Sequence, residues 1–226
     1  MKQRKRYLLS LVIAFLTVSV YAQKDITKFL GIPVDGTKSE MVNQLKAKGF
    51  KYDSDLDCLF GEFNGREVSI LIGMNKDKVW RIVLTDVEQS DEIGIKIRFN
   101  TLCRQFLENK KYTSPISDYT IPQSEDISYE ILVNKKRYEA SFYQAPDNID
   151  KFLNDLNTHL LQFFTDEEIN NPSDIIKSKI EQIGADYMIE VLSKKLVWFM
   201  IHEQFGKYRI AMYYENAYNG PNGEDL

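Results

Sequence analysis

The chain has 226 residues, of which 43% are hydrophobic and 27% are charged, and its formal net charge is −4 at neutral pH. Two cysteines and a modest glycine and proline content exclude a disulfide-rich miniprotein and a collagen-like or low-complexity chain. No apolar run reaches the roughly 18 residues of a membrane-spanning helix, so we expect a globular protein without a stable membrane span.

The first 22 residues are typical of a secretory signal peptide. Basic residues at positions 2, 4, 5 and 6 precede the apolar segment 8–20, which is too short to cross a bilayer. Val20 and Ala22 occupy positions −3 and −1 of a cleavage site before Gln23. An uncleaved membrane anchor is the alternative interpretation. We therefore expect export to the periplasm or the medium.

Export and acidity exclude several functions. Cleavage removes four basic residues and no acid, so the formal charge changes from −4 to −8. A chain this acidic is a poor ligand for nucleic acid, because phosphate contacts need a positive surface. ATP is scarce outside the cytoplasm, which disfavours nucleotide-hydrolysing chemistry.

The N-terminal half predicts two helices and three strands. Thr37 and Glu40 form a capping box, which predicts that a helix begins at the next residue after Thr37. Asn64-Gly65 is the signal of a type I′ hairpin turn. The predicted elements are a helix over 38–48, strands over 56–63, 66–73 and 79–86, and a helix over 91–110.

The C-terminal half predicts further hairpins and helices. Segment 112–126 is expected to be a loop or a weak edge strand. Segment 187–192 is ambiguous between helix and strand, with strand favoured by the alternation of Tyr187, Ile189 and Val191. The other predicted elements are a hairpin of 127–133 with 137–144, helices over 148–165 and from Ser173 to Gly184, and a hairpin of 196–202 with 207–215.

Strands joined by hairpins, with amphipathic helices between them, indicate an α+β fold. We expect antiparallel β-meander sheets with helices packed on one face, built as a degenerate α-βββ repeat of roughly 60 residues. No Pro/Ser-rich linker divides the mature chain. It is therefore predicted to be a single domain, 23–226, with the halves 23–145 and 146–226 as the alternative division.

Two segments carry a resemblance to known proteins. Residues 29–37 (FLGIPVDGT), and the ending 206–214 (GKYRIAMYY) with 219–226 (NGPNGEDL), resemble a family of uncharacterised exported proteins from Bacteroidota. A glycine, a capped short helix, Lys48-Gly49-Phe50 and a β-meander are also distantly similar to β-lactamase-inhibitor-like and outer-membrane-assembly lipoprotein modules. Those modules bind or scaffold other molecules, so the resemblance implies a binding fold.

The sequence contains no motif that assigns a catalytic residue, a cofactor or a metal ligand. His159 and His202 lack the spacing of a zinc helix, and no nucleophile motif accompanies them. Cys58 and Cys103 would meet an oxidising compartment, where they either form a disulfide or remain two buried thiols.

The last predicted hairpin carries the candidate binding site. With Phe205-Gly206 as a two-residue turn, Trp198 lies opposite Tyr213 and His202 opposite Arg209. An aromatic pair beside a cationic end could stack on sugars or hold a peptide. The alternative is that a second layer covers this face, which would make Trp198 an ordinary core residue.

The favoured hypothesis is an exported, non-enzymatic binding protein of the cell envelope, whose partner is a protein, a peptide or a glycan. The first alternative is a hydrolase of glycans or cell wall that uses a carboxylate pair. The second alternative is a passive structural component of the envelope.

Cleavage before Gln23 can be tested by mass. When the chain is expressed in a Gram-negative host with its own leader, the intact mass of the product should equal that of residues 23–226. Ala22→Arg places a large charged residue at position −1 and should prevent cleavage. A wild-type product that retains residues 1–22 would contradict the prediction.

Overall fold

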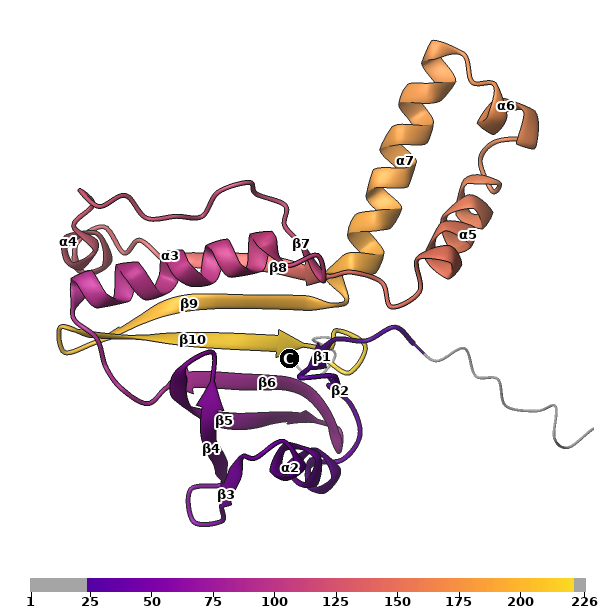
Figure 1. The fold of residues 1–226 in the computed structure, drawn as a ribbon. Coiled ribbons are helices and arrows are strands. Elements are labelled where there is room, and N and C mark those ends of the chain that lie inside the picture. The colour runs from indigo at the N-terminus through magenta and orange to yellow at the C-terminus, as the bar shows by residue number, and fades with distance from the viewer. Residues whose placement is uncertain (1–23, 222–226) are drawn as a thin grey trace, which may run out of the picture.

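The structure is a computed structural model that describes residues 24–221, so the predicted signal peptide, residues 1–22, lies outside the described residues. Its main feature is an eight-stranded sheet in which every pairing is antiparallel (Figure 1). In spatial order the strands are β3 (Lys51–Asp53), β4 (Cys58–Phe63), β5 (Arg66–Asn75), β6 (Lys78–Asp86), β10 (Lys207–Glu215), β9 (Leu196–Gln204), β8 (Glu139–Gln144) and β7 (Tyr112–Thr113). A separate two-stranded hairpin joins β1 (Lys28–Phe29) to β2 (Ile32–Pro33).

The centre of the sheet consists of two three-stranded meanders joined at their third strands, and the short strands β3 and β7 each add one edge. Strands β4, β5 and β6 form the first meander, and β8, β9 and β10 form the second. The helix α2 (Lys38–Ala47) precedes the first, and α3 (Glu92–Glu108) precedes the second. The α+β class with an antiparallel sheet is therefore confirmed. Two α-βββ units are present within one continuous sheet, which runs through both of the halves 23–145 and 146–226.

The hydrophobic core lies between α2, α3 and one face of the sheet. Both the capping box of α2 and the Asp91 N-cap of α3 are formed. Along α3, buried side chains recur at the spacing of one helix face, and Phe99 meets Phe199 of β9 with ring centroids 5.2 Å apart. The side chains of α2 join the same core: Met41 and Leu45 belong to the buried cluster that contains Ile70 and Ile82 of the sheet. Residues of both halves of the chain therefore belong to one buried cluster.

Two sequence predictions of strands were wrong. Residues 127–132 form the helix α4 (Ile127–Leu132), because Asp126 caps its first turn by accepting a hydrogen bond from the Tyr129 backbone N–H. Strand β8 instead pairs with β9 on one side and with the short strand β7 on the other. Segment 187–192 belongs to the helix α7 (Asp174–Ser193), which continues through Gly184.

A helical arm is inserted between β8 and β9. It consists of α5 (Ile149–Leu160), α6 (Asp166–Asn170) and α7, and Figure 1 shows it projecting from the end of the sheet. Within the arm, the Tyr187 ring stacks on His159 with centroids 4.7 Å apart, and Leu156 approaches Gly184. These contacts explain the helical state of 187–192, since Tyr187 and Gly184 face α5.

The two ends of the arm meet at the buried residue Lys195. Its carbonyl accepts from the Gln144 N–H at 3.0 Å, and its ammonium donates to the Ala145 carbonyl at 2.9 Å. The same ammonium pairs with Asp25, which ties the N-terminal segment to the base of the arm. Within residues 24–221, no helix has both the length and the apolar character needed to cross a membrane.

The arm should be dispensable for folding of the sheet. Replacing residues 149–193 by a short Gly-Ser linker should preserve the circular dichroism of the sheet and one cooperative unfolding transition, because the chain ends meet at Lys195. Phe199→Ala is the control that removes core packing, and it should lower the free energy of unfolding by about 3–5 kcal/mol. An unfolded arm-less protein would contradict this view of the arm.

Candidate functional site

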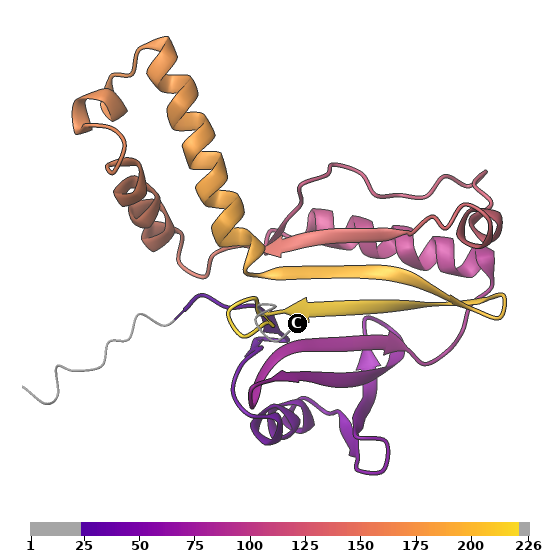
Figure 2. The same cartoon turned by 180° about the vertical axis from the view of Figure 1, so that it is seen from behind.

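One face of the sheet has no helix over it among the described residues; we call it the open face. Figure 2 views the sheet from the side opposite α3. Side chains alternate along each strand, so the neighbours of the core residues on β5, β6, β10, β9 and β8 point to this side. The half-exposed or exposed apolar side chains on the central strands of this face are Leu71, Val83, Met200, Trp198 and Tyr213. The predicted alternative, a second layer over Trp198, is not found in residues 24–221.

The predicted pairing of the last hairpin is confirmed. Phe205 and Gly206 both have positive φ angles, of 55° and 72°, as a two-residue type I′ turn requires. Trp198 lies opposite Tyr213, and His202 lies opposite Arg209. A two-residue turn fixes the register, and the register decides which side chains share a face.

The Trp198–Tyr213 pair is held in a cluster with three further residues. The two rings stack with centroids 4.0 Å apart and planes 8° from parallel. Arg81 lies over the Tyr213 ring at 5.3 Å and over the Trp80 ring at 4.0 Å. Glu215 accepts from the Trp198 Nε1–H at 2.8 Å and pairs with Arg81 at 2.6 Å. These contacts hold the rings in a fixed orientation.

Sequence analysis missed Trp80, Arg81 and Glu215. Arg81 reaches the site because β6 pairs with β10, which places it opposite Glu215. No turn connects these two strands, so neither their pairing nor its register has a local signal in the sequence. Only the alternation within each strand could have shown which face Arg81 occupies.

Arg209 is a cation without an anionic partner on this face. It is half-buried, its Nε is a buried atom with no hydrogen-bond partner, and it forms no ion pair with a described residue. The exposed His202 lies beside it on β9. The guanidinium of Arg209 is partly accessible and no carboxylate of the described residues pairs with it, so this end of the open face favours an anionic group from outside the chain.

The disulfide that the sequence left open is not formed. Both cysteines are free and buried. Cys58 adjoins the core residue Leu59 on β4 and therefore points to the opposite side of the sheet, whereas Cys103 lies in the core on α3. Burial raises the pKa of both thiols, that of Cys103 to about 12.

Carboxylates gather around a cavity of about 690 Å³ at the base of the arm. Asp25, Asp147, Asp155 and Glu190 line it together with lysines. Although partial burial opposes the shift, the hydrogen bond from Lys28 and the charge of Lys195 lower the pKa of Asp147. The hydrogen bond from Lys194 lowers the pKa of Glu190. These carboxylates, the side chains that could most readily ligate a metal, are thus occupied by lysine ammonium groups. No cluster of metal-ligating residues occurs within 24–221.

Comparisons with protein-family models, with curated proteins and with solved structures found no match to this chain. The function is therefore argued from the geometry of the site alone.

The two thiols should be unreactive in the folded protein. At pH 8, 5,5′-dithiobis(2-nitrobenzoate) should label neither cysteine at an appreciable rate, because burial disfavours the reactive thiolate. After denaturation without reductant, two thiols per chain should be counted. A count of zero would show that Cys58 and Cys103 are bonded.

Proposed function

We propose that this chain is an exported, non-enzymatic binding module that holds a protein partner against its open face. The observation that carries the proposal is the half-exposed Trp198–Tyr213 pair on a sheet face without a covering helix. Aromatic side chains that are held rigidly lose little entropy on binding, and they are enriched among the residues that dominate interface energies. Export rests on the leader sequence.

The arrangement of the rings favours a protein over a glycan. A sugar stacks on the free face of an aromatic ring. Here the inner faces of Trp198 and Tyr213 are occupied by each other, and Arg81 lies over Tyr213. Val83, opposite Tyr213, and Met200, two residues from Trp198 on β9, flank the pair on this face, and this apolar surround suits apolar side chains of a folded partner.

The charge on this face specifies the partner further. Arg81 is neutralised by Glu215, whereas Arg209 lacks an anionic partner in the described chain. The partner should therefore place an aspartate or glutamate near Arg209 and apolar side chains over the aromatic pair. Such charge complementarity would fix the orientation of the complex.

A photo-crosslinking experiment tests this proposal. p-Benzoylphenylalanine at Met200, on the open face, should give a discrete protein adduct in the envelope of the source cells. At Ile97, which is exposed on α3, it should not give that adduct.

Two matched substitutions identify the contact. Trp198→Ala and Arg209→Glu should each weaken the Met200 adduct by about tenfold or more, as loss of a dominant contact does. Arg104→Glu, an equal change of charge on the exposed side of α3, should have no effect. Identical adducts from Met200 and Ile97, no adduct from Met200, or equal effects of R209E and R104E would overturn the proposal.

The hydrolase alternative has weaker support. A carboxylate-pair mechanism requires one acid whose pKa is raised so that it remains protonated. Asp25 and Asp147, two of the carboxylates that line the cavity at the base of the arm, are both within ion-pair distance of Lys195. The pKa of Asp147 is lowered, which is opposite to the requirement.

A further inference from the structure

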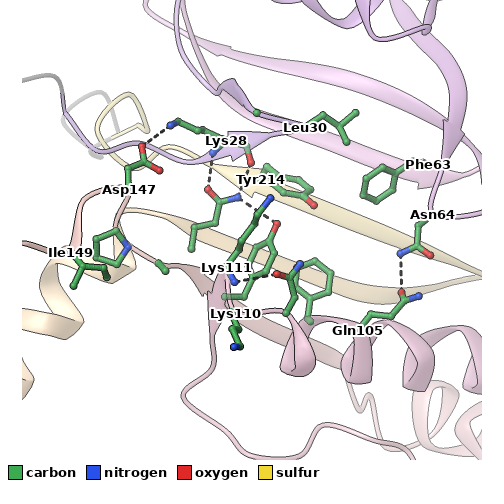
Figure 3. Close-up of a pocket in the computed structure, with 17 residues that line it drawn as sticks. Lys28, Leu30, Phe63, Asn64, Gln105, Lys110, Lys111, Asp147, Ile149 and Tyr214 are labelled. Carbon is green, nitrogen blue, oxygen red and sulfur yellow. Dashed lines mark hydrogen bonds and ion pairs between the residues drawn. The ribbon is translucent and has the colours of Figure 1, made fainter.

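A second site lies on the helix-covered side of the sheet. A pocket of about 770 Å³ opens where the C-terminal end of α3, the β1–β2 hairpin and the start of α5 meet (Figure 3). Pockets that bind small molecules measure roughly 300–1,000 Å³. Tyr214 lines this pocket, whereas its neighbour Tyr213 points to the open face. The two sites are therefore on opposite sides of β10.

The wall of this pocket is apolar and fixed by the core. Its aromatic members are Phe63, Phe106, Tyr112 and Tyr214. The rings of Phe63 and Tyr214 pack on the core residue Phe29 with centroids 5.3 Å and 4.9 Å away, and Phe106 meets Tyr112 at 4.6 Å. Such a wall is formed before any ligand arrives, so binding an apolar body there needs little reorganisation.

The rim of the pocket is positive although the chain is acidic. Three lysines line it against a single carboxylate, Asp147, which pairs with Lys28 at 2.6 Å. Lys110 and Lys111 form no ion pair with a described residue. Figure 3 shows the Lys111 side chain extending from the end of α3 toward Tyr214, whereas Lys110 points away from the pocket.

The polar side chains beside Lys111 already form hydrogen bonds within the protein. The Gln144 amide accepts from the Lys28 N–H at 2.8 Å and donates to the Lys28 carbonyl at 2.6 Å. Asn64 donates to Gln105 at 2.8 Å. The Lys111 ammonium is thus a charged donor directed toward the pocket that has no acceptor among residues 24–221.

We propose that this pocket binds a small amphipathic anion, with its carboxylate or similar anionic group at Lys111 and its apolar body against the aromatic wall. The alternative role of Lys111 is to complement the C-terminal end of the α3 dipole. Lys110 is equally placed for that role, because both lysines directly follow the cap residue Asn109. Comparing the two lysines therefore separates the two roles.

Calorimetric titration of the purified protein with matched probes tests the site. The anionic probes are 2-naphthoate and decanoate, and their neutral counterparts are 2-naphthamide and decanamide. We expect at least one anion to bind about tenfold or more tightly than its amide, since a charge-assisted contact is lost in the amide. Tighter binding of 2-naphthoate would indicate that the pocket accepts a planar apolar body, and tighter binding of decanoate would indicate an acyl chain.

Substitutions of exposed lysines complete the test. Lys111→Met should weaken binding of the anion by about tenfold or more and leave binding of the amide unchanged. Lys111→Arg should retain binding, and Lys110→Met should change neither affinity. Trp198→Ala should also be without effect, which separates this site from the open face. Failure of both anions to bind at millimolar concentration, or equal effects of K111M and K110M, would overturn the proposal.

Discussion

The pairing of β6 with β10 is the constraint on which the rest of the structure depends. It runs from Arg81 opposite Glu215 to Thr85 opposite Ala211 and joins two meanders that would otherwise each end in an unpaired edge. Asn216 extends the junction: its backbone N–H donates to the Trp80 carbonyl and its side chain to the Val34 carbonyl, both at 2.8 Å. A single core and a single open face both follow from this junction.

The same junction places the two candidate sites. On one side of β10, Tyr213 joins Trp198 and Arg81 on the open face. On the other side, Tyr214 packs on Phe29 and lines the pocket near Lys111. Because adjacent residues of a strand face opposite ways, one strand contributes to both a broad surface and an enclosed cavity. A protein partner and a small anion could therefore occupy the molecule together without contact between them.

Local signals in the sequence were sufficient for the fold class and for part of the site. Capping boxes and type I′ turns involve neighbouring residues, so the helix after Thr37 and the pairing of Trp198 with Tyr213 were correctly predicted. The strand predicted over 187–192 was wrong because that segment is helical through its contact with α5, a tertiary interaction. Arg81 and the pocket near Lys111 were not found because they arise from segments far apart in the chain.

The position of β10 also determines when the protein can fold. The central strand of the sheet is the last one to be synthesised, so β6 has no partner on one side until residues 207–215 are available. Pairing strands so distant in sequence requires closure of a long loop, which slows folding. During that interval the chain exposes a strand edge that other chains could pair with. For the exported protein proposed above, late completion of the core would keep the chain unfolded and competent for translocation.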